Sequence, residues 1–235
     1  MNLQVVYEDN HLIAVNKPAG ILVHADITED TTLEDFVKEY IKLRYNKPGD
    51  VFLGVIHRID RPVSGLVIFA RTSKALTRMN KLFKDRQIEK TYWAITRQRP
   101  DLSKNTLVHY IAKDKTKNKA TAYIELSNRA KSVNAKRSEL SYDILAGVNN
   151  RNLLEIKPKT GRPHQIRVQL AKINCAIVGD IKYGYPQPNH DGSISLHSRS
   201  LSFIHPVKKE PILIKANPPE TQEWKQFADV MEVDF

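Results

Sequence analysis

One acidic side chain lies between cationic ones in a short polar stretch of the sequence. Asp60 is flanked by Arg58 and Arg61, and Pro62 and Gly65 break regular structure just after it. Reactive side chains are commonly presented on such loops, where a carboxylate can attack an electrophile or accept a proton. An aspartate between two arginines also fits a salt-bridged surface loop. These residues alone leave both interpretations open.

A tyrosine and an arginine later in the chain could complete a site around this carboxylate. The strand pattern at 90–96 places Lys90 and Tyr92 on one face, and a phenol beside a carboxylate can stack on a base or move a proton. Tyr92 equally fits a half-buried strand aromatic. Arg167 flanks the apolar stripe of a helix expected after Thr160, where a guanidinium could pair with a buried carboxylate and hold it ionised.

Strands and helices alternate along the chain without a repeat. The Asp60 stretch lies between two short apolar runs, 51–56 and 66–70, that read as buried strands. We also expect extended segments at 12–15, 21–23, 91–96, 121–126, 140–145, 152–157, 195–203 and 212–216. Helices are predicted after Thr32, after Thr72 or Ser73, and after Thr160 with Pro163 in its first turn. Many strands with few helices favour an α+β fold around a large mixed sheet.

The charge of the chain favours a polyanionic partner. The formal net charge is +11 and the sequence pI is about 9.6 over 235 residues, a length that fits one large domain because no linker is evident. Residues 104–137 hold nine Lys or Arg against two acids. This basic segment is either a solvated face or a surface that follows phosphates.

Composition also excludes several classes of protein. Hydrophobic residues make up 41% of the chain, and no apolar run approaches the length of about 20 residues that spans a bilayer. The N-terminus lacks a secretion signal, and Cys175, as a single thiol, fits a reducing cytoplasm and a buried position. The histidines show no zinc-type spacing and Cys175 stands alone, which argues against a metal-dependent hydrolase. No glycine-rich phosphate loop occurs either.

Several motifs, in order along nearly the whole chain, resemble the RluA-type pseudouridine synthases, which isomerise uridine in structured RNA. They are YEDNHLIAVNKPAG (7–20), HRIDRPVSG (57–65), KTY (90–92), TGRPHQIR (160–167), GDIKYG (179–184) and LHSRSLSFIHP (196–206). The resemblance implies the pseudouridine synthase fold, a mixed, mostly antiparallel sheet flanked by helices and loops with a central basic cleft. It implies a single catalytic domain over residues 1–235, with no room before it for the small RNA-binding module of some relatives.

The resemblance also implies the chemistry and the partners. Family members cleave the bond between ribose C1′ and uracil N1 and rejoin the base through C5, without a cofactor. The partner would be tRNA or rRNA in the cytoplasm, with no DNA, no membrane and no obligate protein partner. Which RNA and which uridine are modified stays open.

The resemblance assigns roles to individual residues. Asp60 matches the essential aspartate, which can add to C1′ or remove the C2′ proton. Tyr92 matches the tyrosine that stacks on uracil and helps to remove the C5 proton, and Arg167 matches the basic residue that pairs with the catalytic aspartate. Arg58 matches an arginine that fills the space of the flipped nucleotide, and Ile166 one that packs against the base. In the same motifs we expect further substrate contacts from Arg61, Arg162, His164 and Gln165.

A few positions depart from the usual letters of the family. Ile59 replaces a common Leu, Pro62 and Val63 stand where an acidic residue and a Thr are frequent, and Gln169 stands where His is common. These departures leave the activity credible and put substrate contacts in doubt. The rival hypothesis is a catalytically silent RNA-binding or RNA-folding protein on the same scaffold, for which the basic segment would suffice.

Overall fold

The computed structural model describes residues 3–25 and 30–232, and the chain divides into two compact units. Unit 1 comprises Met1–Lys90 and His197–Pro219, and unit 2 comprises Thr91–Leu196 and Glu220–Phe235. The chain therefore passes between the units more than once. The single catalytic domain expected from the sequence stays a prediction.

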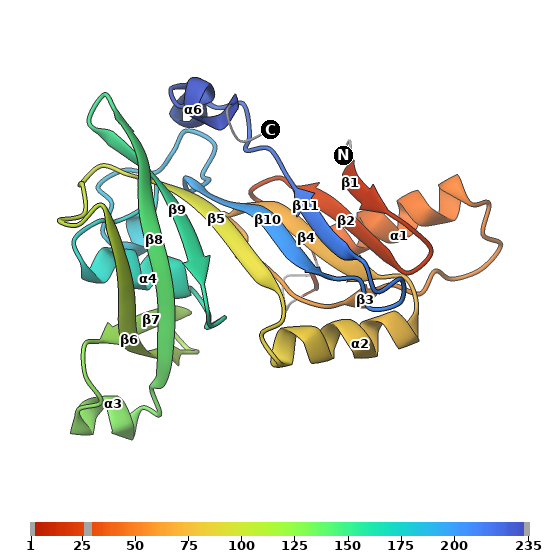
Figure 1. The fold of residues 1–235 in the computed structure, drawn as a ribbon, viewed down its shortest axis with the longest axis horizontal. Helices are drawn as coiled ribbons and strands as arrows, with labels where there is room; N and C mark the ends of the chain where they lie inside the picture. The colour runs from red at the N-terminus through yellow and green to blue at the C-terminus, as the bar shows by residue number, and fades with distance from the viewer. Residues whose placement is uncertain (1–2, 26–29, 233–235) are drawn as a thin grey trace. The chain divides into compact units, whose positions relative to one another are not determined.

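Unit 1 is built on a mixed set of strands with two helices (Figure 1). Its elements are β1 (Gln4–Glu8), β2 (Leu12–Lys17), α1 (Leu33–Arg44), β3 (Gly54–Val55), β4 (Ser64–Ala70), α2 (Ser73–Lys84), β10 (Leu196–Ile204), whose first residue belongs to unit 2, and β11 (Pro211–Lys215). The strand order is β1-β2-β4-β10, with β11 paired to β10 and β3 to β4. The β4–β10 pair is parallel, and the other pairs of this unit are antiparallel.

Unit 2 is an antiparallel set of strands with short helices. Its elements are β5 (Glu89–Thr96), whose first two residues belong to unit 1, β6 (Lys104–Asp114), β7 (Lys119–Tyr123), α3 (Asn128–Ser132), β8 (Lys136–Val148), β9 (Arg151–Pro158), α4 (Gln165–Lys172), η1 (Ile181–Tyr183), α5 (Gln222–Lys225) and α6 (Ala228–Glu232). The strand order is β5-β9-β8-β6-β7. The two units together confirm the predicted α+β class with mostly antiparallel pairing.

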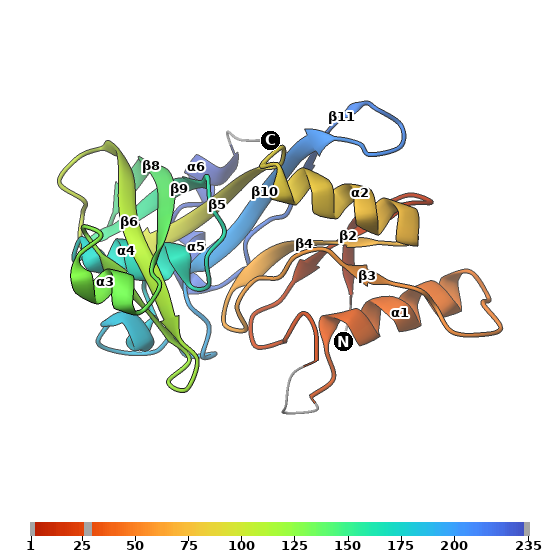
Figure 2. The same cartoon turned by 90° about the horizontal axis from the view of Figure 1, so that it is seen from below.

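The core of unit 1 follows from local sequence signals. Every residue of β4 is buried, as its continuous apolar run predicts. Thr32 and Thr72 cap α1 and α2 through their side-chain oxygens, which confirms both predicted helix starts. Figure 2 shows α2 along β3 and β4, where Leu76 and Met79 join the core cluster that includes β4.

A glycine allows the two parallel strands of unit 1 to approach. Gly65 has φ of +114°, and a Cβ added there would lie 2.4 Å from the carbonyl oxygen of Ser198. Beside this contact the Ser64 hydroxyl donates to His197 Nδ1 over 2.9 Å, and His197 Nε2 donates to the carbonyl of Ala216 over 2.9 Å. Burial lowers the pKa of His197 to about 4, so the imidazole is neutral. His197 therefore supports the sheet.

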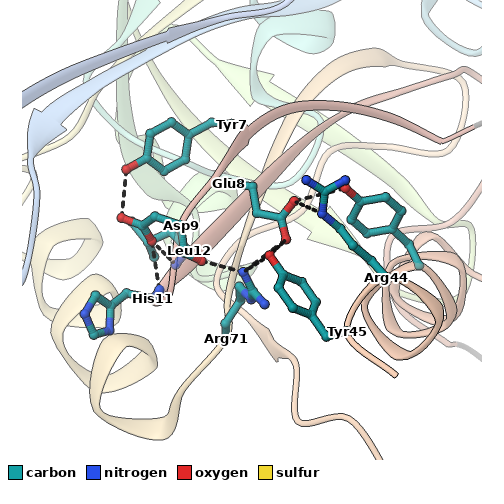
Figure 3. A network of polar contacts seen from close by, with 9 residues as sticks. Tyr7, Glu8, Asp9, His11, Leu12, Arg44, Tyr45 and Arg71 are labelled. Carbon is teal, nitrogen blue, oxygen red and sulfur yellow. Dashed lines mark hydrogen bonds and ion pairs between the residues drawn. The ribbon is translucent and has the colours of Figure 1, made fainter. Parts of the chain in front are cut away.

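A polar network joins the turn after β1 to α1 and to the end of β4 (Figure 3). The Arg71 guanidinium donates to Glu8 over 3.0 Å and to the carbonyl of Asp9 over 2.6 Å, and the Tyr45 hydroxyl donates to Glu8 over 2.8 Å. The Asp9 carboxylate accepts from the amides of His11 and Leu12, both at 2.8 Å. Burial raises the pKa of Asp9, but hydrogen bonds from Lys208 and these amides outweigh it and hold the pKa below its usual range. The network fixes the β1–β2 turn through hydrogen bonds and ion pairs.

The fold differs from the sequence expectations in several places. Residues 21–23 form no strand, because the carbonyls of Leu22 and Val23 accept from the amides of Leu33 and Glu34 at the start of α1. β1 and β6 were not expected. β1 is short and only partly buried, and the alternating burial of β6 at Leu107, His109 and Ile111 includes a polar side chain. No helix among the described residues is both long and apolar enough to cross a membrane.

We expect Gly65→Ala to lower the free energy of unfolding by roughly 2–4 kcal/mol, because the new methyl group combines a strained φ with a clash against the β10 backbone. Urea denaturation measures the change. Gly49→Ala is the matched control, since a Cβ at Gly49 meets nothing within 4 Å. Equal stability of the two variants would contradict this account of the β4–β10 contact.

Candidate active site

Asp60 lies on the loop between β3 and β4. Of the buried strand expected at 51–56, only Gly54–Val55 forms, and Phe52 is exposed. The amide of Val63 donates to the carbonyl of Asp60 over 3.0 Å, which closes a turn. Ile59 and Val63 are buried on either side of the turn, while Asp60 is half-buried and Arg58 is exposed. The two departures from the family letters at Ile59 and Val63 are therefore core residues. They hold the backbone on which Asp60 and Arg58 are carried.

A buried lysine holds this turn from within unit 1. Lys17 has no exposed surface, and its ammonium group donates to the carbonyls of Pro18 and Ile21 over 2.9 Å and of Arg61 over 3.2 Å. Burial lowers the pKa of Lys17 to about 7, although attraction to the Asp60 carboxylate opposes the shift and repulsion from Arg61 adds to it. Lys17 thus links the turn after β2 to the turn that carries Asp60.

Arg61 strengthens the same link with both its backbone and its side chain. Its carbonyl accepts from the amide of Gly20 over 2.8 Å, and its Nε donates to the carbonyl of Gly20 over 2.9 Å. Its Nη1 lies 3.0 Å from a carboxylate oxygen of Asp30. Both of these side-chain contacts are to residues outside the loop that carries Asp60. The predicted role of Arg61 in substrate binding stays a prediction.

The histidine of the same motif is a neutral structural group. His57 Nε2 accepts from the amide of Ile68 over 3.1 Å, and its ring stacks on Phe83 with centroids 5.0 Å apart. Burial, and then repulsion from Lys90, lower the pKa of His57 to about 3. A neutral ring that accepts on Nε2 carries its proton on Nδ1. His57 therefore ties the Asp60 loop to β4 and α2.

Tyr92 lies in unit 2, on β5 opposite Ile156 of β9. Its side chain is half-buried, while the neighbouring Trp93 is 1% exposed and belongs to a core cluster. The alternation along β5 therefore sends Trp93 into the core and leaves Tyr92 on the other face. This placement fits both the stacking role and the strand aromatic expected from the sequence.

The helix that carries Arg167 begins later than predicted. α4 starts at Gln165, and His164 occupies the N-cap position with φ of 54°, without a side-chain cap. Thr160 does not cap it: its hydroxyl donates to Gln165 Oε1 over 2.8 Å and accepts from the amide of Glu139 over 2.9 Å. The expected cap at Thr160 and first turn at Pro163 are therefore wrong, because Thr160 serves a contact to β8 instead.

The predicted substrate-binding residues around α4 differ in exposure. Arg162 is exposed, whereas His164 and Ile166 are buried. Gln165 is buried, and its side chain accepts from the amide of Arg162 over 3.0 Å and donates to the carbonyl of Glu139 over 3.1 Å. Gln165 thus orders this loop, and its contact with substrate stays a prediction.

Arg167 forms a buried ion pair within unit 2. It is 5% exposed, Asp180 is 1% exposed, and Nε and Nη2 of Arg167 lie 2.7 Å and 2.8 Å from the two carboxylate oxygens of Asp180. The two parallel bonds give the guanidinium a defined orientation. The predicted pair of Arg167 with Asp60 would join residues of the two units, and it stays a prediction.

Two further residues are structural. Gln169, which stands where relatives often have His, is fully buried and donates to the carbonyl of Leu107 over 3.1 Å, next to His109 Nδ1 at 3.1 Å. It joins α4 to β6 rather than to a substrate. Cys175 is buried, and burial raises the pKa of its thiol to about 11, which confirms the buried position expected for it. Within the described ranges, three or more His, Cys, Asp or Glu side chains nowhere gather in a way that could hold a metal ion.

The motifs that carry these residues also match a known family. Residues 11–172 match the model of the RNA pseudouridylate synthases. The chain belongs to this family. Pseudouridine synthases are isomerases that act on RNA, so the protein is an RNA-modifying enzyme.

Pseudouridine synthases similar to this one act on more than one RNA, according to their names. The chain is 30% identical to tRNA pseudouridine synthase C of Vibrio parahaemolyticus, covering 100% of this chain and 97% of that one. It is also 30% identical to ribosomal large subunit pseudouridine synthase D of Zymomonas mobilis, covering 94% of this chain and 71% of that one. The solved structure of human RNA pseudouridylate synthase domain containing 4 has the same fold, with a TM-score of 0.77 at 24% identity over 96% of this chain and 93% of that one.

Three buried residues next to the predicted site carry no predicted role from the sequence alone: Lys17, Asp180 and Tyr183. Each stands in one of the quoted motifs, so the motifs were the available signal. The sequence does not predict that a lysine or aspartate in a polar motif is buried, because charged residues are mostly exposed. Only the tertiary structure shows their partners, which are carbonyl oxygens for Lys17 and the Arg167 guanidinium for Asp180 and Tyr183.

We expect Lys17→Met in this pseudouridine synthase to lower the free energy of unfolding by about 2 kcal/mol at neutral pH, because it leaves buried carbonyls without their donor. The difference from the wild type should widen as the pH rises above about 7. Over that range the unfolded state keeps the lysine proton, up to its reference pKa of about 10.4, while the folded state loses it.

Thermal unfolding at several pH values measures this effect. Lys74→Met, on the exposed side of α2, is the matched control and should leave both stability and its pH dependence unchanged. A Lys17→Met variant as stable as this control at every pH would show that the carbonyl cage does not hold the turn.

Proposed function

We propose that this enzyme converts specific uridines of structured RNA to pseudouridine, with Asp60 as the catalytic carboxylate. The observation that carries the proposal is the anchorage of the Asp60 turn. Buried Ile59 and Val63 flank it, and the ammonium group of Lys17 holds the carbonyl of Arg61. A carboxylate on so firmly held a loop loses little entropy when it meets the anomeric carbon of a flipped nucleotide.

The carboxylate has two chemical routes to the same product. In one, Asp60 adds to C1′ as uracil leaves through N1, and in the other it removes the C2′ proton to give a glycal. In both, the base turns and C5 bonds to C1′, as the Asp60–C1′ bond breaks in the first route or the C2′ proton returns in the second. The C5 proton is then lost and N1 takes up a proton, which completes pseudouridine. Deuterium at C2′ distinguishes the routes, because the second alone breaks the bond to that atom.

The remaining roles follow from side-chain chemistry. Tyr92, half-buried on β5, stacks on the uracil and assists removal of the C5 proton. Arg167 pairs with Asp60 through its guanidinium group. Exposed Arg58 occupies the space left by the flipped nucleotide, and Ile166 packs against the base.

The substrate is tRNA or rRNA. Relatives of similar identity are named for one or the other, so the fold of the RNA around the uridine is the feature to test. Comparing pseudouridine maps of total RNA from cells with and without the gene identifies the modified uridine directly.

We expect Asp60→Ala to abolish release of tritium from RNA labelled at uracil C5 while RNA affinity stays within about threefold of wild type, because the variant lacks the carboxylate but keeps the basic surface. Filter binding reports affinity on the same transcripts. Asp50→Asn, on an exposed residue before β3, is the matched control and should keep full activity.

Two results would contradict the assignment. Tritium release by Asp60→Ala at the wild-type rate would remove Asp60 from the mechanism. RNA binding without tritium release by the wild-type protein, on both tRNA and rRNA, would favour the silent RNA-binding protein on this scaffold.

We also propose that the basic segment 104–137 binds RNA phosphates. It forms β6, β7, α3 and the start of β8, and eight of its nine basic residues are exposed. Some pair with acids: Lys104 lies 3.0 Å from Asp143, and Arg137 lies 2.7 Å from Glu139. Lys115 and Lys117, in the β6–β7 turn, show exposed side chains suited to phosphate contact.

We expect replacement of both Lys115 and Lys117 by Ala to weaken RNA binding and to reduce the slope of log affinity against log salt by about 1–2, because each neutralised phosphate contributes about 0.7–0.9. Titrations at several salt concentrations measure the slope. The double variant Lys42→Ala and Lys47→Ala removes two exposed lysines near the end of α1 and should leave the slope unchanged. An equal fall in both variants would mean that net charge, not this turn, sets the affinity.

A further inference from the structure

The guanidinium group of Arg167 contacts an aromatic ring as well as the Asp180 carboxylate. The guanidinium carbon of Arg167 lies 5.0 Å from the centre of the Tyr183 ring, within the range of a cation–π contact. Asp180 binds the same guanidinium through two hydrogen bonds. Arg167 therefore meets a carboxylate in its own plane and an aromatic ring nearby, which together restrict its side-chain rotation.

Tyr183 is itself held in a fixed orientation. Its hydroxyl oxygen accepts from the amide of Ala120 on β7 over 2.8 Å and lies 2.7 Å from His164 Nδ1. Because the oxygen accepts the amide proton, its own proton is available to donate to His164. His164 is the residue before α4, so Tyr183 ties β7 to the start of the helix that carries Arg167.

The backbone around these residues is shaped to present them together. Gly179 has φ of +84°, and a Cβ there would lie 2.7 Å from both the Asn189 side chain and the Ser193 carbonyl. The carbonyl of Asp180 accepts from the amide of Tyr183 over 3.1 Å at the start of η1. Residues three apart in such a turn lie on the same side. The Gly179–Tyr183 spacing thus places the carboxylate and the ring against one guanidinium.

We propose that Asp180 and Tyr183 act as a clamp that sets the orientation of Arg167 for its work in the isomerisation. The two residues are positioning residues, because they reach the reaction through Arg167. The proposal rests on the role of Arg167 given above. A buried pair costs desolvation that an apolar pair would avoid, so its presence fits a requirement for orientation.

The test is a kinetic cycle on the full chain. We expect Asp180→Asn to lower kcat for uridine isomerisation about 100-fold with little change in the KM for RNA, because a small misplacement of the guanidinium is costly in rate. In an Arg167→Gln background the same substitution should change kcat less than about threefold, since nothing is left to position. Full additivity of the two substitutions would overturn the clamp.

A milder variant covers the case in which Asp180→Asn fails to fold. Tyr183→Phe keeps the ring and loses its two hydrogen bonds, so we expect kcat to fall about tenfold with RNA affinity unchanged. Tyr185→Phe is the matched control, because Tyr185 has a hydroxyl bonded to Arg151 and lies near that guanidinium in the same segment. It should keep wild-type kcat.

The outcomes separate the clamp from the proposed function. Wild-type kcat in Tyr183→Phe, together with an inactive Asp60→Ala, would overturn the clamp and leave the function standing. Activity in Asp60→Ala would overturn the catalytic assignment whatever the Tyr183 result. A loss of thermal stability in Tyr183→Phe without a loss of kcat would assign Tyr183 a structural role and reject the clamp.

Discussion

A cation removed from water must be surrounded by oxygen acceptors, and this constraint shapes both parts of the predicted site. Lys17 is fully buried and meets it with carbonyls from the turn after β2 and from the Asp60 turn. The cost of leaving that ammonium group unsatisfied holds the two turns together. The position of Asp60 therefore depends on a cation that lies outside its own loop.

Arg167 meets the same constraint in a different way. Its planar fork matches the two oxygens of the Asp180 carboxylate, whereas the compact ammonium group of Lys17 suits carbonyls that converge from irregular backbone. Exchanging the two cations would leave each cage with the wrong geometry. The identity of each cation is thus set by the elements that supply its oxygens.

Much of the fold follows from local sequence signals. Where the sequence predictions were wrong, contacts between distant residues or an unexpected backbone conformation were the cause. The caps at Thr32 and Thr72 and the buried run of β4 were predictable because each depends on a few adjacent residues. Residues 21–23 look extended, but their carbonyls receive the first amides of α1. The start of α4 was misplaced because His164 takes a left-handed conformation that no residue pattern there indicates.

The sequence motifs predicted the residues of the site, but they did not predict the oxygen atoms that surround Lys17 and Arg167. Strand-breaking residues around Asp60 indicated a loop, but Lys17 meets the Arg61 carbonyl 44 positions along the chain, and Arg167 meets Asp180 13 positions along. The three protons of Lys17 all go to carbonyls, so it acts on Asp60 through space. Asp180 likewise neutralises much of the charge of Arg167. Each cation is thus held by at least one oxygen from a distant part of the chain, and no short residue pattern specifies such a contact.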